Sequence, residues 1–372
     1  MAEGRREVVR RQPPDYAGGS LINLVAELEH RLTGSAESPL LHRHLAALMP
    51  DAPSYVVVVL DGLGAGQLDH PRAATLARSS VATLDAPFPT TTTVALASVA
   101  TGLSPLRHGL LGYQLWLPEL GVVANTIKWT TLWGEPLAVD TGSLLPAPNL
   151  WERLAAHGVE PITVQPAGFA GSPLSSLLYR GCRFEAAATV AELVAATVQL
   201  AALPGRLIVT YLPHVDFAAH VRGRHAPEYA DAVGLVDTAW SRLAALRPAA
   251  ATVLGTADHG HVDFPPDRQV RIPRADHEGR IFYGDGRAMY VRGDGAPLAK
   301  ALPAVWVPIE ELYGWWGPGP AHPAVHERQP DGALVADDGY LLLHRHSDDR
   351  MIGNHGGLTY AERTVPLLLA SG

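Results

Sequence analysis

The sequence has almost no cysteine and no long apolar run, and both absences narrow the kind of protein that it encodes. Its 372 residues include a single cysteine, Cys182, which excludes an intrachain disulfide and gives no indication of an oxidising compartment. No segment contains the roughly 18 to 20 apolar residues that a membrane-spanning helix needs. The first residues, MAEGRREVVRRQPPDY, are partly basic but lack the apolar core of a secretory signal. We therefore expect a cytoplasmic protein with no membrane partner.

Lysine is also scarce, because only Lys128 and Lys300 occur, and the formal net charge is -8. This acidic balance argues against an extended nucleic-acid-binding surface, and bound divalent cations would offset part of it. Hydrophobic residues make up 47% of the chain and charged residues 18%, as in ordinary soluble globular proteins. The length allows a large core but is short for three domains.

One stretch, YVVVVLDGLG at residues 55–64, organises the predicted fold. Its β-branched residues show no polar alternation, which predicts a strand buried on both faces, as in a parallel sheet covered by helices. Asp61 follows this strand directly, and Gly62 and Gly64 allow the chain to turn sharply. Open α/β sheets bind ligands at the carboxyl ends of such strands, although Asp-Gly is also a common turn pair.

Further buried strands are predicted at 206–212 and 251–257, and a last strand at 364–370. They alternate with segments of helical periodicity, among them 21–32, 38–48, 69–79, 189–203 and 227–246. This alternation predicts an α/β protein, a three-layer α/β/α sandwich with a mostly parallel central sheet.

Composition divides the chain further. Residues 1–50 are predicted to form an N-terminal tail, loose up to about residue 20, and helices packed on the core. Residues 51–372 would form the main domain. Within it, prolines, glycines and short β-like pieces between 262 and 350 predict a small inserted α+β subdomain, a cap or lid.

Candidate metal ligands follow the predicted buried strands. Asp61, Asp216 and Asp258 each come just after one of them, so all three should converge on one edge of the sheet. His220 lies four residues after Asp216, His259 is adjacent to Asp258, and His355 precedes the last strand in GNHGG. Aspartate oxygens and histidine nitrogens are ligands for Zn²⁺ or a similar ion. Six such groups exceed one tetrahedral site and suit two ions about 4 Å apart.

A threonine cluster, Thr90 to Thr93, precedes a predicted helix that ends at Gly102. A helix N-terminus favours an anion such as phosphate, and a hydroxyl beside a metal ion can act as a nucleophile. Each motif has an ordinary alternative, since threonine is a common helix cap and the chain contains 17 histidines. Their joint placement favours the two-metal interpretation.

Taken together, VVVVLDGLG, FPTTTTVALASVATGLSPLRHGLLG, YLPHVDFAAH, TADHG and NHGGLTYAERTVPLL resemble the alkaline phosphatase superfamily. Within it, they resemble the nucleotide pyrophosphatase/phosphodiesterase (type I phosphodiesterase) branch, over Tyr55 to Gly260 and His355 to Leu369. The resemblance implies an alkaline phosphatase-like catalytic domain and a threonine nucleophile three residues after Pro89 and nine before Thr101, which is Thr92. It also implies hydrolysis through a covalent phospho-threonine intermediate.

The resemblance further implies two zinc ions, although Mn²⁺ is also compatible with mixed Asp/His sites. One ion would be held by Asp61, Thr92, Asp258 and His259, and the other by Asp216, His220 and His355. The chain departs from the family at Tyr113, where an asparagine usually donates to a phosphate oxygen. The phenol of Tyr113 could donate in its place, or it could point elsewhere.

The implied substrate is a small phosphodiester or nucleotide-like molecule, and the sequence does not indicate the oligomeric state. A phosphomonoesterase or phosphonate hydrolase with the same metals is an alternative, for which Arg107 and Lys128 are the candidate cations. A catalytically inactive, ligand-binding homologue is a further alternative. Three tryptophans of the insertion would either form a stacking wall for a planar group or pack its own small core: Trp306, Trp315 and Trp316.

Overall fold

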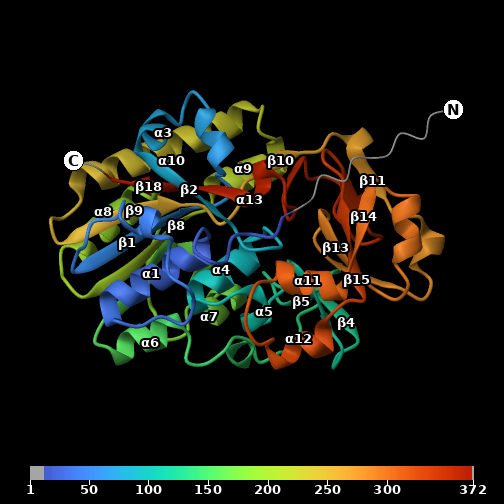
Figure 1. The fold of residues 1–372 in the computed structure, drawn as a ribbon. Helices are drawn as coiled ribbons and strands as arrows, with labels where there is room; N and C mark the ends of the chain where they lie inside the picture. The colour runs from blue at the N-terminus through green and yellow to red at the C-terminus, as the bar shows by residue number, and fades with distance from the viewer. Residues whose placement is uncertain (1–11, 371–372) are drawn as a thin grey trace.

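A seven-stranded sheet forms the centre of the computed structural model, which describes residues 12–370 (Figure 1). Its strand order is β2-β18-β9-β1-β8-β6-β7, and β18 runs in the direction opposite to the other six strands. All seven residues of the central β1 are buried, which confirms the prediction of a mostly parallel sheet with both faces covered. The strands are β1 (Ser54–Leu60), β2 (Ser80–Asp85), β6 (Glu160–Pro166), β7 (Arg183–Ala187), β8 (Arg206–Leu212), β9 (Ala251–Thr256) and β18 (Thr364–Leu369).

Helices cover both faces of the sheet and complete the three-layer sandwich. Figure 1 shows α3 and α10 above the sheet and α1 and α6 below it. In one group of helices, α4 (Thr92–Thr101) contacts α1 (Leu21–Thr33), α6 (Leu150–Ala156) and α7 (Pro173–Leu178). The other is α3 (Ala74–Ser79), α8 (Val190–Ala201), α9 (His214–Arg222) and α10 (Pro227–Leu246). None of the helices in residues 12–370 is both long and apolar enough to cross a membrane.

Two predicted helices near the N-terminus are shorter than their periodicity suggested. Only α2 (Arg43–Ala46) forms within 38–48, where Pro39 lies near the predicted start. The 69–79 prediction reduces to α3, because a 3₁₀ turn (Ala65–Asp69) and Pro71 precede it.

The expectation of a loose tail up to residue 20 is wrong for residues 12–20, while residues 1–11 lie outside the described part of the chain. Tyr16 is buried, and its hydroxyl donates to the carbonyl oxygen of Trp315 (2.8 Å) and accepts from the backbone N–H of Phe88 (3.0 Å). These two hydrogen bonds tie the segment to both the sheet domain and the insertion.

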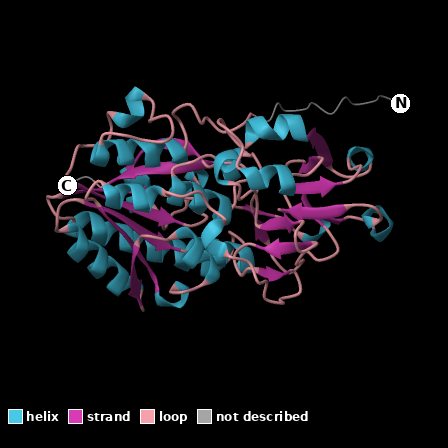
Figure 2. Ribbon diagram, turned by 90° about the horizontal axis from the view of Figure 1, so that it is seen from below, coloured by secondary structure: helices cyan, strands magenta, loops and turns pink. Residues whose placement is uncertain are grey.

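A cap covers one end of the main sheet, and we use this name for residues 114–131 and 262–354 (Figure 2). Its largest sheet is antiparallel, in the order β12-β13-β15-β14, and packs against the helix α11. A second sheet, β3-β4-β5, contacts β12 and was not predicted. The cap elements are β3 (Gln114–Leu117), β4 (Val122–Asn125), β5 (Thr130–Thr131), β10 (Val262–Asp263), β11 (Gln269–Arg271), β12 (Ile281–Gly284), β13 (Ala288–Arg292), β14 (Ala304–Pro308), α11 (Ile309–Trp315), α12 (Pro323–Arg328), β15 (Gly332–Ala336), β16 (Leu341–Leu343) and β17 (Gly353–Asn354).

A buried ion pair joins the cap to the core. Arg287, at the turn before β13, forms a bidentate pair with Glu362 of α13 (Tyr360–Arg363), with N–O distances of 2.9 and 3.1 Å. Their side chains are 2% and 0% exposed. Glu362 also accepts hydrogen bonds from the backbone N–H of Gly357 (2.9 Å) and from the hydroxyl of Thr359 (2.7 Å). The pair therefore fixes the cap turn against the loop that carries His355.

A buried histidine next to α4 makes the fold sensitive to acid. His108, on α5 (Pro105–His108), accepts a hydrogen bond from the backbone N–H of Leu110 through Nδ1 (3.2 Å), and its Nε2 lies 3.0 Å from Ser98 Oγ. Burial lowers the pKa of His108 to about 3. Protonation would place a second N–H against that of Leu110.

We expect this histidine to cost stability as the pH falls. In the unfolded chain His108 binds a proton near pH 6.5, whereas in the folded chain it does so only near pH 3. The free energy of unfolding therefore decreases as the pH falls from 6.5 toward 3. Between pH 7 and 5, His108 should account for a loss of about 2 kcal/mol in the free energy of unfolding. His108→Asn retains an acceptor for the N–H of Leu110. In urea unfolding measured at pH 7 and at pH 5, this variant should lose about 2 kcal/mol less between the two pH values than wild type does. An unchanged difference between the two pH values would contradict the assignment.

Candidate active site

The predicted site residues meet at the carboxyl edge of the central sheet. Asp61 follows β1, Asp216 lies in the first turn of α9 after β8, and Asp258 follows β9. The backbone N–H of Asp216 donates to the carbonyl oxygen of Asp61 (3.0 Å). Gly62 has a φ of 73°, and a Cβ there would lie 2.9 Å from Asp216 Cα. Glycine is therefore required at this position for the two strand ends to approach each other.

A first cluster surrounds the start of α4. His259 Nε2 lies 3.1 Å from Thr92 Oγ1, 3.6 Å from Asp61 Oδ1 and 3.5 Å from Asp258 Oδ2. Each carboxylate is held through its other oxygen. Tyr211 donates its hydroxyl hydrogen to Asp61 Oδ2, while Asp258 Oδ1 accepts from the backbone N–H groups of Gly62 (3.1 Å) and His259 (3.0 Å).

The remaining atoms of this cluster fit a divalent cation. Asp61 Oδ1 and Asp258 Oδ2 are buried and have no hydrogen-bond partner within residues 12–370. His259 Nδ1 lies 3.1 Å from the carbonyl oxygen of Gly260, to which it donates, so its Nε2 carries a lone pair. Two carboxylate oxygens and an imidazole lone pair thus converge on a hydroxyl whose single proton can satisfy only one of them, which is the donor set of a metal site.

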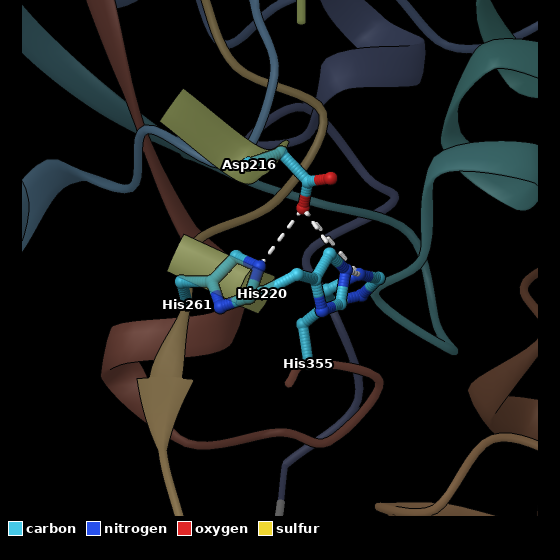
Figure 3. A group of neighbouring side chains, drawn as sticks. All are labelled: Asp216, His220, His261 and His355. Carbon is cyan, nitrogen blue, oxygen red and sulfur yellow. Dashed lines mark hydrogen bonds and ion pairs between the residues drawn. The ribbon is translucent and has the colours of Figure 1, made fainter. Parts of the chain in front are cut away.

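A second cluster lies beside the first (Figure 3). His220 Nε2 and His355 Nε2 lie 3.3 and 3.7 Å from Asp216 Oδ1, and 3.2 Å from each other. The Nδ1 atoms donate to the carbonyl oxygens of Gly353 (2.7 Å) and Thr90 (2.8 Å), respectively. Both Nε2 atoms therefore carry lone pairs and cannot hydrogen bond to each other. A cation between them and Asp216 would satisfy all three.

Sequence analysis missed a fourth member of this cluster. His261 Nε2 lies 2.9 Å from Asp216 Oδ1, and the ring is fully buried. Asp216 also belongs to a group with Asp61 and His259, so it links the two clusters. The only sequence signal for His261 was its position two residues after His259 in DHGH.

The charges of the site are unbalanced without cations. Burial, together with the negative charges of Asp216 and Asp258, raises the pKa of Asp61 well above its ordinary value. Burial also raises the pKa of Asp216, but the imidazoles of His220, His261 and His355 outweigh it and hold that pKa well below the ordinary range. Burial and the neighbouring His259 lower the pKa of His355. Three carboxylates gathered in a buried region are stable when cations compensate them.

A cavity of about 420 Å³ opens beside Thr92, between the clusters and the cap. Tyr113 lines it, and its hydroxyl oxygen accepts a hydrogen bond from Asn125 Nδ2 (2.7 Å). Asn125 Oδ1 accepts from the backbone N–H groups of Ile127 (3.0 Å) and Lys128 (3.1 Å), which fixes the orientation of the amide. Burial raises the pKa of Tyr113, so the phenol is neutral and its hydrogen is free to donate to a ligand.

Of the two candidate cations and the three tryptophans named in the sequence analysis, only Lys128 lines the cavity. Arg107 does not and instead donates hydrogen bonds to the carbonyl (2.6 Å) and carboxylate (3.1 Å) oxygens of Glu37. Trp315 and Trp316 are buried in the core, and Trp306 packs against the cap's own cluster, so none of the three lines the cavity. The alternative of a stacking wall is therefore wrong, and these tryptophans serve packing.

A buried carboxyl of the cap also lines the cavity. Asp285 lies between β12 and β13, and it accepts a hydrogen bond from the backbone N–H of Tyr113 (3.4 Å). Burial raises its pKa to about 7. Neither Asp285 nor Asn125 was singled out from the sequence, because neither lies in a recognisable motif.

Comparisons with known proteins agree with this fold. Murine ectonucleotide pyrophosphatase / phosphodiesterase 5 is 18% identical, with a TM-score of 0.63 over 84% of this chain and 87% of that one. Phosphonoacetate hydrolase from Sinorhizobium meliloti 1021, solved with phosphonoformate, is 19% identical, with a TM-score of 0.65 over 87% and 91% of the two chains. Human ectonucleotide pyrophosphatase / phosphodiesterase 5 is 15% identical, with a TM-score of 0.60 over 85% and 87%. A search of curated protein sequences finds no match.

The family comparison covers most of the chain. Residues 55–358 match the type I phosphodiesterase / nucleotide pyrophosphatase family, which includes the strand end at Asp61, the start of α4 and His355. This range also spans the cap. The chain therefore belongs to the type I phosphodiesterase / nucleotide pyrophosphatase family of the alkaline phosphatase superfamily.

Proposed function

We propose that the protein is a metal-dependent phosphodiesterase that cleaves small, nucleotide-like phosphodiesters with Thr92 as its nucleophile. The observation that carries this proposal is the position of Thr92 Oγ1, 3.1 Å from His259 Nε2 and beside two unpaired carboxylate oxygens. Family membership supports a phosphoester hydrolase in general. The murine relative was also solved as an inactive threonine-to-alanine variant in complex with AMP, which supports both a threonine nucleophile and a nucleotide-like ligand.

Seven residues would hold two divalent ions. Thr92, His259, Asp61 and Asp258 suit one ion, and Asp216, His220 and His355 suit the other. The imidazoles favour Zn²⁺, and Mn²⁺ is compatible with such mixed donors. When bound, the ions would ease deprotonation of the threonine hydroxyl and neutralise charge on the phosphoryl oxygens.

The chain's own residues account for the remaining chemistry. Thr92 is the first residue of α4, whose free backbone N–H groups favour an anionic phosphoryl group. Its Oγ1 attacks phosphorus, the first alcohol leaves with a proton, and a phospho-threonine diester forms. Water then cleaves the bond between phosphorus and Oγ1, which releases a phosphomonoester and restores Thr92. Tyr113 donates to a phosphoryl oxygen, in the role of the asparagine that other members use.

A phosphomonoesterase or phosphonate hydrolase is the second candidate, because Lys128 lines the cavity. Such substrates carry more negative charge than a diester, and a lysine beside the cavity could compensate it. The solved phosphonoacetate hydrolase, in complex with phosphonoacetate or phosphonoformate, shares this fold. The diester proposal is preferred because Lys128 is the only lysine that lines the cavity and no arginine does so among the described residues.

Hydrolysis assays with three substrates test the proposal. We expect Zn²⁺- or Mn²⁺-loaded protein to cleave bis-p-nitrophenyl phosphate faster than p-nitrophenyl phosphate or phosphonoacetate. Chelation with EDTA should abolish the activity, and added Zn²⁺ should restore it. Preference for p-nitrophenyl phosphate or phosphonoacetate would favour the second candidate. Metal-loaded protein that cleaves none of the three would support the inactive homologue.

A further inference from the structure

We propose that His261 is a positioning residue, which orients the Asp216 carboxylate by donating a hydrogen bond from Nε2, and is not a fourth ligand of the second metal ion. This inference rests on the metal site of the proposed function. Asp216, His220, His261 and His355 offer atoms that all lie within 4.8 Å of one another, so proximity alone does not separate ligands from supporting groups (Figure 3). The hydrogen bonds around each ring do separate them.

The two ring nitrogens of His261 have different surroundings from those of its neighbours. In His220 and His355, Nδ1 donates to a backbone carbonyl, which leaves Nε2 with the lone pair that a metal needs. In His261, Nδ1 is buried and has no partner in the described part of the chain. A Cβ on Gly353 would lie 2.8 Å from this Nδ1, so the Gly353 backbone packs directly against it.

The partnerless Nδ1 decides which nitrogen of His261 carries the proton. A hydrogen on Nδ1 would be a buried, unsatisfied donor, which costs about 1–3 kcal/mol. A hydrogen on Nε2 instead points at Asp216 Oδ1, 2.9 Å away, at the usual length of an N–H···O hydrogen bond. Histidines that bind metals almost always donate their other ring N–H to an acceptor, and His261 has none there.

The distances between these side-chain atoms also separate His261 from the metal ligands. Ligands about 2.1 Å from a tetrahedral ion lie about 3.4 Å from one another. The distances among Asp216 Oδ1, His220 Nε2 and His355 Nε2 are 3.3, 3.7 and 3.2 Å. The distance from His261 Nε2 to Asp216 Oδ1 is shorter, at 2.9 Å. The first three atoms are spaced as ligands are, whereas His261 is spaced as a hydrogen-bond donor.

This role matters for catalysis because it leaves the second ion with three protein ligands. Catalytic zinc sites generally keep one position for water or substrate, whereas structural sites are closed by four protein ligands. A fourth imidazole would complete a tetrahedral set and leave no position for water or substrate. Through its hydrogen bond, His261 would fix the carboxylate that links both clusters without entering either set of ligands.

Cobalt binding tests the inference independently of catalysis. Co²⁺ would be titrated into metal-free wild type, His261→Gln and His261→Met, with calorimetry for affinity and visible absorption for the coordination environment. Glutamine can donate from Nε2 to Asp216, whereas methionine fills similar space without a donor. We expect His261→Met to bind the second Co²⁺ about 10- to 100-fold more weakly, with the band shape of wild type, and His261→Gln to recover affinity to within a few-fold.

Controls separate this inference from the proposed function. His108→Asn removes another buried histidine, whose ring hydrogen bonds to Ser98 and Leu110 and belongs to neither cluster, and it should leave both Co²⁺ affinities unchanged. Thermal unfolding of the metal-free variants would identify a folding defect. Weak binding by both His261 variants with altered absorption bands would show that His261 is a ligand, and unchanged binding by His261→Met would show that it has no role. Wild type that binds no Co²⁺ would overturn the proposed metal site and this inference together.

Discussion

Replacing Thr92 with alanine is expected to lower the turnover of bis-p-nitrophenyl phosphate by at least about 10³-fold, because the nucleophilic oxygen is removed. Among the neighbouring threonines, Thr90 and Thr93 cannot substitute for it because their hydroxyls are already hydrogen bonded. Thr90 donates its hydroxyl hydrogen to the carbonyl oxygen of Gly357 (2.9 Å), and Thr93 donates to that of Gly112 (3.3 Å). Turnover would be measured at saturating Zn²⁺, so that a small loss of metal affinity does not limit the rate.

Two further variants make this prediction specific to the nucleophile. Thr92→Ser keeps a hydroxyl and should retain measurable turnover, and Thr93→Ala removes a buried hydroxyl one residue further into α4 and should keep most of the activity. Acid quenching during turnover, followed by mass spectrometry of peptides, should find a p-nitrophenylphosphoryl group on Thr92 in wild type. Thr92→Ala that turns over at the wild-type rate would instead mean that water attacks phosphorus directly.

Replacing Arg287 with methionine is expected to lower the free energy of unfolding by about 3–5 kcal/mol, because it leaves the Glu362 carboxylate buried and unpaired. Burial alone would raise the pKa of Glu362, yet Arg287 and two hydrogen-bond donors keep that pKa below its ordinary value. Arg287 also donates to the carbonyl oxygens of Asp337 (2.9 Å) and Tyr340, which brings the 336–341 segment into the same network. Urea unfolding at pH 7 would measure the loss.

Matched variants test whether the unpaired charge is the cause. The double variant Arg287→Met/Glu362→Gln removes the charge but keeps an acceptor for the N–H of Gly357, so it should recover part of the lost stability. Arg350→Met removes an arginine that pairs with Asp348 and whose side chain is 86% exposed. It should cause no measurable change in the free energy of unfolding. A double variant no more stable than Arg287→Met would show that the loss comes from packing and not from charge.

The same network connects stability to the site. Glu362 accepts a hydrogen bond from the N–H of Gly357, which lies two residues after His355. Loss of Arg287 should therefore loosen the loop that carries this histidine. Metal affinity of Arg287→Met would therefore fall along with stability. The cap consequently affects the site through its anchor as well as through the cavity that it lines.

Most strands of the sheet and most of the residues gathered at its edge could be predicted from the amino-acid sequence. Runs such as the one at β1 are apolar on both faces, so they can only be buried strands, and the aspartates that end them follow from chain order alone. The family was also recognisable from these motifs, because the spacing of their residues along the chain reflects the local geometry of strand, turn and helix. Thr92 and His355 were identified in this way.

Features that depend on contacts between distant segments became visible only in the folded structure. The β3-β4-β5 sheet has strands of two to four residues, too short to show a period, and it is stabilised by pairing and by contact with β12. Tyr16 is anchored by groups 72 and 299 residues away. His261 faces Asp216, 45 residues earlier in the chain, and its unpaired Nδ1 becomes visible only once Gly353 packs against it. Side-chain surroundings of this kind are set by packing across the fold, and local periodicity does not contain them.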